Sequence, residues 1–208
     1  MNNKKGAMFG LDARIALAIF GALSVISGAA LYSAIKSAKT EKFRQFFVET
    51  EKASEHFYLE NGSPLSQFDA NNLNTVNLAI NHDNLDTWNG PYMDYISTIS
   101  YYGVKTSLLN SFSTNLFMEI YLHKASTWVN LAAYDDCVVG SDDCAEYIRI
   151  QQASATEDDE KLLKSLFLDL DNLVDGGDGE LAGKVRALDG ASFSYSIWYK
   201  SIPRKRTV

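Results

Sequence analysis

The chain has 208 residues and a formal net charge of −7 at pH 7. This length suits one domain with an anchoring segment, and the acidity argues against a basic surface that binds nucleic acid. The sequence contains no Gly-x-Ser-x-Gly element, no phosphate-binding loop and no metal-spaced histidines. We therefore expect a protein that is not an enzyme, that requires no cofactor and that has no nucleic-acid partner.

The N-terminus is the most informative stretch of the chain. A short basic leader with Lys4 and Lys5 precedes an uncharged apolar run at residues 15–35. A helix of about 20 apolar residues is long enough to cross a hydrocarbon core about 30 Å thick. Asp12 and Arg14 stand at the near end of this run, where an ordinary secretory signal carries no acid. The two lysines predict a cytoplasmic N-terminus for a single-pass protein.

Three interpretations compete for this segment. A cleaved secretory signal would use the small residues 27–30 as its cut site, but the apolar run is too long and continues past them. A plain signal anchor would fit the length and the basic leader. In the third interpretation the leader ends at Ala7, and the mature chain begins at Met8 with Asp12 as its fifth residue. A cut after Gly6 is the runner-up, and it places the acid one position late.

With the cut after Ala7, the N-terminus resembles the type IV pilin and type II secretion pseudopilin family. That family has a short basic leader ending in a small residue, a start residue that is usually Phe or Met, and an acid four residues later. A long apolar helix follows, and Gly21 falls in its Ile/Leu, Ala and Gly pattern. Two residues depart from the family pattern, because Ala7 replaces Gly and Asp12 replaces Glu. The family's helix-breaking Pro is also absent, which favours an unbroken helix.

The resemblance implies a structural subunit of a type IV pilus or a secretion pseudopilus. Prepilin peptidase would cut between Ala7 and Met8 and N-methylate Met8. The subunit would wait in the bacterial inner membrane and then join sibling subunits through an inner-membrane assembly platform. The filament would lie in the periplasm or on the cell surface. Its assembly residues would be Asp12, which pairs with the new α-amino group of a neighbour, and Gly21. A charge at the headgroup level is the alternative role for Asp12.

The helix is predicted to continue beyond the membrane. Apolar residues recur at helical spacing from Ala38 to Phe57, and Asn61-Gly62-Ser63-Pro64 is a strong stop. The sequence therefore divides into four parts: a leader at 1–7, a membrane-spanning and filament-core helix at 8–35, an amphipathic continuation at 36–60 and a globular domain at 61–208. Two helices broken near Lys36 are the alternative.

The globular domain is predicted to mix strands and helices. Residues 96–102, 116–122 and 192–202 have the composition of strands, whereas residues 127–134 fit a strand or a helix. An amphipathic helix is expected after Thr156, which can cap it. The fold class is therefore α+β and pilin-like. A long N-terminal helix, with a membrane-spanning first half, packs on a small antiparallel sheet with an additional helix.

Two further elements resemble parts of the same family. Residues 88–92 read Trp-Asn-Gly-Pro-Tyr, similar to the element that introduces the sheet in several pilins, and they follow an Asn-rich stretch expected to be a surface loop with one turn of helix. Residues 174–177, Val-Asp-Gly-Gly, and residues 183–186, Gly-Lys-Val-Arg, resemble the helix end and strand that precede the last strand of pilin-like proteins. The middle of the chain matches the family only weakly.

Acidic residues cluster at the same helix end. Asp171, Asp175, Asp178 and Glu180 are candidate ligands for calcium, because hard cations bind clustered oxygen atoms. Their spacing is not that of an EF-hand. Some pseudopilins bind calcium near this part of the fold. A glycine-capped helix end with solvated acids is the alternative interpretation.

The two cysteines, Cys137 and Cys144, enclose a short polar loop. A disulfide between them would form outside the cytoplasm. A second functional class also fits these features: a single-span envelope sensor or binding protein with a periplasmic, calcium-responsive acidic domain. Such a protein would keep Lys4 and Lys5 as a cytoplasmic tail, so a mature chain that begins at Met1 would favour it.

Overall fold

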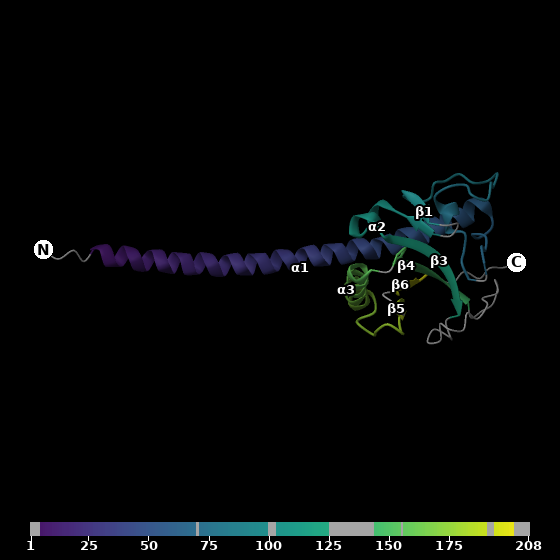
Figure 1. The fold of residues 1–208 in the computed structure, drawn as a ribbon. Coiled ribbons are helices and arrows are strands. Elements are labelled where there is room, and N and C mark those ends of the chain that lie inside the picture. Colours follow the sequence, from purple (N-terminus) through teal and green to yellow (C-terminus); the bar gives the residue numbers. More distant parts are fainter. Residues whose placement is uncertain are drawn as a thin grey trace. The chain divides into compact units, whose positions relative to one another are not determined.

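The computed structural model describes residues 5–69, 71–99, 103–124, 144–154, 156–190 and 194–201. The chain forms two units, Met1–Glu41 and Lys42–Val208. The second unit contains the last turns of the long helix as well as the predicted globular domain. The fold is α+β, with a long apolar N-terminal helix, an antiparallel sheet and further helices (Figure 1).

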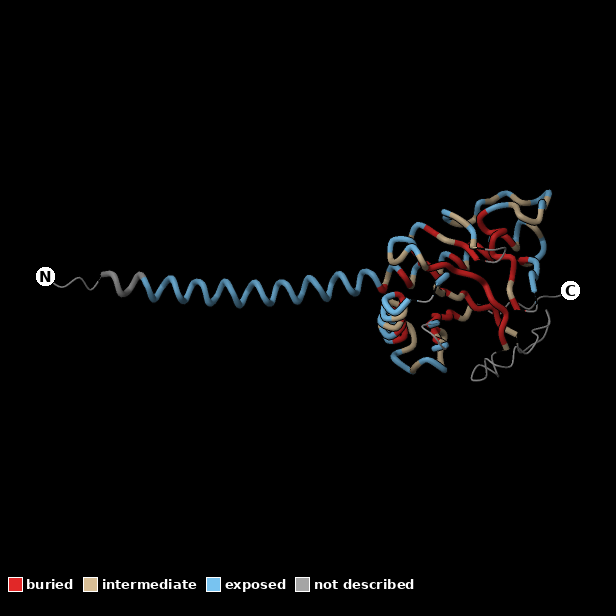
Figure 2. The backbone as a smooth tube through the Cα atoms, in the orientation of Figure 1, coloured by how far each residue is buried: buried red, intermediate tan, exposed pale blue. Residues whose placement is uncertain are grey.

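The first unit contains the N-terminal part of helix α1. The whole helix spans Lys5–Asn61 without interruption, so it does not break near Lys36. Every residue from 10 to 39 is exposed (Figure 2). The stretch is rich in Ala and Leu, which are strong helix formers, and it contains no proline. Its mean hydropathy reaches 2.1, so the helix is long and apolar enough to cross a membrane. The predicted membrane-capable helix is confirmed in this sense.

The second unit buries the last turns of α1. Phe43, Phe47 and Phe57 are at most 1% exposed, whereas Glu49 and Lys52 on the opposite side are exposed. This division follows from apolar residues spaced at three and four positions, which share one face of a helix. The helix ends where predicted: Gly62 adopts a left-handed φ of +67°, and its N–H donates to Tyr58 O at 2.9 Å. Glycine takes this conformation without the steric cost of a side chain.

Within the residues that the structure describes, the sheet has six strands in the order β1-β2-β3-β4-β6-β5, and every neighbouring pair is antiparallel. Their bounds are β1 Ser97–Ile99, β2 Gly103–Lys105, β3 Leu116–Lys124, β4 Cys144–Gln152, β5 Val185–Gly190 and β6 Ser194–Lys200. The other elements are the 3-10 helix η1, Thr75–Leu78, and the helices α2, Ser107–Phe112, and α3, Glu157–Val174. The three strands predicted at 96–102, 116–122 and 192–202 correspond to β1, β3 and β6. The sheet is larger than these three strands, because β2, β4 and β5 join it, and β5 begins within the motif at residues 183–186. The ambiguous residues 127–134 lie outside the described residues.

The main core lies on one face of the sheet. Tyr199 stacks on Phe47 of α1 with ring centroids 4.7 Å apart, and Tyr195 meets Phe167 of α3 at 6.3 Å. These tyrosines alternate with Trp198, whose side chain belongs to a second aromatic cluster with Tyr121 and Tyr147. Successive residues of a strand point to opposite faces, so the predicted alternation in this last strand produces two packed faces.

A buried ion pair accompanies the second cluster. Glu119 and Arg149 are register partners on β3 and β4, and the Arg149 Nε contacts the Glu119 carboxylate. The guanidinium carbon of Arg149 lies 5.1 Å from the Tyr121 ring centroid and 4.9 Å from that of Trp198. Burial raises the pKa of Glu119, while Arg149 opposes this rise. The loss of hydration costs the pair free energy, and its ionic contact and the two aromatic contacts of Arg149 offset this cost.

Side-chain carboxylates order the Asn-rich loop, and Asp83 makes contacts across it. Asp83 accepts hydrogen bonds from Ser66 Oγ at 2.5 Å and from the side-chain amides of Asn74 and Asn77 at 2.6 Å each. Helix η1 lies within this loop, as the predicted turn of helix did. The element at residues 88–92 then packs its aromatics together, with the Trp88 and Tyr92 rings 5.7 Å apart. The loop is thus a hydrogen-bonded part of the domain.

Candidate metal centre

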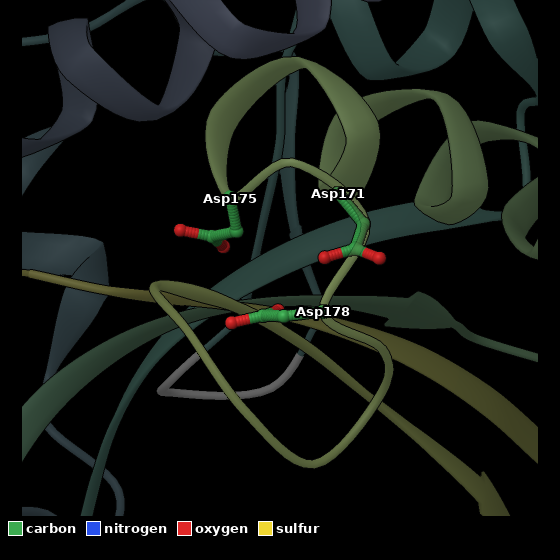
Figure 3. Close-up of side chains that lie close together, drawn as sticks. All are labelled: Asp171, Asp175 and Asp178. Atoms are coloured by element: carbon green, nitrogen blue, oxygen red, sulfur yellow. The ribbon is translucent and has the colours of Figure 1, made fainter.

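Three of the four predicted calcium ligands meet at the end of α3. Asp171 lies in the last turn of the helix, Asp175 is its C-cap and Asp178 lies in the following loop. Each offers a carboxylate oxygen, and these oxygens all lie within 4.8 Å of one another. Figure 3 shows the three side chains on the helix end and the loop beneath it. Residues seven positions apart in sequence thus form one acidic cluster.

Glycines shape the loop that closes the cluster. Four glycines of this loop have a positive φ, a backbone conformation that other residues rarely adopt: Gly176, Gly177, Gly179 and Gly183. Gly183 is needed for a second reason, because a Cβ there would lie 2.6 Å from the Asp175 carboxylate and 2.8 Å from Asp178 Oδ1. The predicted glycine-rich helix end is therefore confirmed, and it brings the backbone close to the acids.

Backbone amides hold two of the carboxylates. Asp175 Oδ2 accepts from Lys184 N at 2.9 Å and from Val185 N at 2.7 Å, which ties the helix end to the start of β5. Asp171 Oδ2 accepts from Gly179 N at 3.1 Å. These bonds therefore fix the orientation of both carboxylates.

Asp171 is the unusual member of the cluster. It is only 3% exposed, and its Oδ1 is buried without a hydrogen-bond partner in the described part of the chain. Burial raises the pKa of this carboxyl, and the neighbouring Asp178 and Asp175 raise it further. A buried carboxylate oxygen without a partner is costly, and a bound cation or a proton would relieve it. The orphaned atom therefore distinguishes this cluster from solvated surface acids.

Glu180, the fourth predicted ligand, makes a different contact. Its Oε1 accepts a hydrogen bond from the buried Tyr195 hydroxyl at 3.0 Å. Burial raises the pKa of Tyr195, and the charge of Glu180 raises it further. This bond attaches the loop to β6 at a second point. Glu180 is therefore outside the close group of three carboxylates, and its role here is to position the loop.

The donor set suits a hard cation. Calcium binds six to eight oxygen ligands in flexible geometry, and Asp171, Asp175 and Asp178 offer three carboxylates of the right type. Backbone carbonyls and water would supply the remaining ligands. Magnesium demands stricter geometry and keeps more of its water. The residues present therefore fit calcium, which would neutralise the charge gathered at the helix end.

The other predicted site residues are separate from this cluster. Ala7 and Met8 lie in the first turns of α1. Asp12 and Gly21 follow in the same helix, and both are exposed. Cys144 begins β4 and is disulfide-bonded. Cys137, the other cysteine of the sequence, lies outside the described residues. The structure does not test the roles assigned to the residues of α1.

Sequence reasoning missed two features of the second unit. The steric requirement at Gly183 was hidden because it depends on side chains eight and five positions earlier, although the glycine itself was visible in the motif. A groove of about 430 Å³ was also missed. Its walls come from three segments, and Phe46, Ala53, His56, Met93 and Leu108 are among its lining residues. No local pattern signals a groove assembled in this way.

Comparisons with family models, with curated proteins and with solved structures find no match to this chain. The class of the protein therefore comes from its own features. In the described residues it is an α+β protein with one helix that is long and apolar enough to cross a membrane and a six-stranded antiparallel sheet.

Proposed function

We propose that this chain is a pilin-like subunit of a type IV pilus or type II secretion pseudopilus. The observation that carries the proposal is the nature of α1. Residues 10–39 of this helix are exposed and largely apolar, and residues 42–61 belong to the folded second unit. A rod of this kind needs an apolar partner outside its own fold, and the bilayer and neighbouring helices are the two candidates.

A filament subunit uses both partners in turn. Before assembly the helix lies in the inner membrane, where its backbone groups are satisfied within the helix. During assembly it exchanges lipid for the apolar helices of sibling subunits. Asp12, at the near end of the apolar run, then pairs with a neighbour's new α-amino group. A carboxylate buried in such a bundle is costly without a partner, so the pair fixes the axial register of the subunits.

The state of Cys144 supports the proposed location. It is disulfide-bonded, and disulfides persist mainly in oxidising compartments such as the periplasm. The second unit is therefore proposed to lie on the outer side of the inner membrane, with the N-terminus in the cytoplasm. Prepilin peptidase and an inner-membrane assembly platform are the further partners that this route requires.

Processing provides the first test. Mass spectrometry of the protein purified from membranes should find a mature chain that begins with N-methylated Met8. A chain that begins at Gly10 or beyond would indicate a different peptidase. A retained Met1 would instead favour the single-span sensor or binding protein.

The assembly role of Asp12 provides the second test. Asp12→Ala should reduce the number of filaments counted by electron microscopy, because the register pair is lost. Asp86→Ala is the matched control, since Asp86 is an exposed acid of the second unit. Filaments in normal number with Asp12→Ala would contradict the pairing.

Calcium binding by Asp171, Asp175 and Asp178 is a second proposal, and it holds for a filament subunit or for a sensor. Asp171 Oδ1 favours it, because this oxygen is buried and has no hydrogen-bond partner among the described residues. Binding to the folded state alone stabilises by about 2.7 kcal/mol at a ligand concentration of 100 Kd. For a domain of this size that corresponds to a rise in Tm of roughly 5–10 °C.

Thermal unfolding with excess Ca²⁺ and with a chelator tests this proposal. Asp178→Asn should remove most of the calcium-dependent rise in Tm, because it takes away one of the three carboxylate ligands. Asp178 is exposed, so the exchange should leave the fold intact. Asp86→Asn is the control and should keep the rise. Equal Tm values with calcium and with chelator in the unaltered protein would remove the calcium site.

A further inference from the structure

Basic residues follow the apolar run of α1 as well as preceding it. Lys36 and Lys39 are exposed and come directly after residue 35, where the apolar stretch ends. Lysines at the end of a membrane helix usually mark the cytoplasmic side. The disulfide at Cys144 indicates that the second unit lies in an oxidising compartment instead. The lysines at this end therefore require a reason other than orientation.

Their spacing provides one. Tyr32, Lys36 and Lys39 stand at positions i, i+4 and i+7 of one continuous helix, so they share a face. Tyr32 is 72% exposed, although an aromatic side chain of this size is usually buried. Tyrosine is enriched at membrane interfaces, where its ring meets the acyl chains and its hydroxyl meets water. A lysine at the same depth keeps its apolar stem near the acyl chains and extends its ammonium group toward the headgroups and water.

The position along the helix agrees with an interface. At 1.5 Å per residue, residues 15–35 extend for about 31 Å, which matches a hydrocarbon core of about 30 Å. With that stretch in the core, Tyr32 lies about 5 Å inside its far boundary, and Lys36 and Lys39 lie just beyond it. The three residues then meet the phosphate layer of the lipid headgroups.

We propose that Tyr32, Lys36 and Lys39 form a headgroup-binding face that holds α1 at a fixed depth through contacts with anionic phospholipids. The inference rests on the membrane-spanning premise of the proposed function. Each lysine near an anionic surface is expected to contribute about a fivefold preference for anionic lipid. The face would hold the subunit in the membrane until assembly draws the helix away from lipid.

Lipid retention by the full-length protein tests the proposal. The protein is reconstituted into vesicles of equal phosphatidylcholine and phosphatidylglycerol, floated on a density gradient, and re-extracted in mild detergent. Native mass spectrometry then counts the retained lipids of each kind. The unaltered protein should retain phosphatidylglycerol at least fivefold over phosphatidylcholine. Lys36→Gln with Lys39→Gln should lower this ratio at least fivefold, and Lys36→Arg with Lys39→Arg should preserve it.

A matched control carries the same charge change elsewhere. Lys52→Gln with Lys161→Gln removes two exposed lysines of the second unit and should leave the lipid ratio unchanged. Equal retention of both lipids by the unaltered protein overturns the headgroup face, as does a control variant that loses the preference equally. In the latter case the net charge of the protein, and not this face, selects the lipid.

The two proposals fail in distinguishable ways. Protein that does not float with any vesicle overturns the membrane premise, and with it both the proposed function and this inference. Protein that floats without lipid preference overturns the headgroup face alone. A lipid preference in a protein that keeps Met1 contradicts the filament subunit and leaves the headgroup face in place.

Discussion

The two parts of helix α1 differ in what surrounds them. Residues 10–39 are the more apolar part, and all of them are exposed, whereas the more polar residues 42–61 carry three phenylalanines at most 1% exposed. Burial therefore does not follow apolarity along this helix. It follows the presence of strands and loops that pack on one face. The proposed function gives the exposed apolar part lipid and other chains as its partners.

The largest expected difference between the two parts of α1 is in the effect of replacing a phenylalanine by alanine. Phe47→Ala should destabilise the second unit by about 3–5 kcal/mol, because it leaves a cavity beside Tyr199. Phe20 lies on the first part of the helix and is 71% exposed, so Phe20→Ala should leave the unfolding free energy of the second unit unchanged. Urea unfolding of the full chain in detergent measures both. Equal losses would show that the first part also packs against the folded domain.

Two glycines provide a comparison of intermediate size. Gly183→Ala should cost about 1–3 kcal/mol, because its φ of +68° is strained for alanine and the new Cβ meets Asp175. It should also remove the calcium-dependent rise in Tm. Gly28→Ala has no atom within 4 Å of the new Cβ and should not lower stability. The thermal unfolding used for the calcium test measures both variants. A Gly183→Ala protein with unaltered Tm would show that the loop is not held against the acids.

The smallest expected effect is a pH dependence at the start of α3. Burial raises the pKa of Asp159, but hydrogen bonds from Ser113, Thr156 and Asn115 outweigh it, and the net pKa lies below the ordinary value of 3.8. A carboxyl with a lowered folded-state pKa stabilises the fold fully above pH 3.8. That contribution is lost as the pH falls from 3.8 through the folded-state pKa. Unfolding should therefore become easier below this pH.

Asp159→Asn isolates this contribution. At neutral pH the variant should be less stable than the unaltered protein by about 1 kcal/mol, because charge-assisted hydrogen bonds become neutral ones. The difference should shrink as the pH falls below 3.8, since the unaltered carboxyl is then protonated as well. Denaturant midpoints measured across this pH range would show it. A difference that stays constant with pH would mean that Asp159 acts through packing alone.

Some of the acidic cluster was predictable, and some was not. The sequence placed four candidate acids near a glycine-rich helix end, and three of them meet in the structure. Sequence spacing could not separate Glu180 from the others, because its partner Tyr195 lies on a strand fifteen positions later. The orphaned Asp171 oxygen was equally hidden, since burial depends on the sheet and loop that cover the helix end.

The strands show the same division. β3 and β6 carry clear apolar or alternating patterns and were predicted from them. β4 was not, because Glu146 and Arg149 interrupt the apolar residues of its sequence. Both residues lie within the sheet, and Arg149 is accommodated by Glu119 across the strand pair and by two aromatic rings. Cross-strand partners therefore decided a strand that local composition did not indicate.

The sequence by itself determined the long helix, its stop at Gly62, the membrane-capable run, the capped helix after Thr156 and the α+β class. Each of these depends on residues within a few turns or positions of one another, which is the range over which helical periodicity and glycine act. The tertiary structure alone decided the number and order of the strands, the groove and the orphaned oxygen of Asp171. These features depend on segments that are distant in the sequence and meet only when the chain has folded.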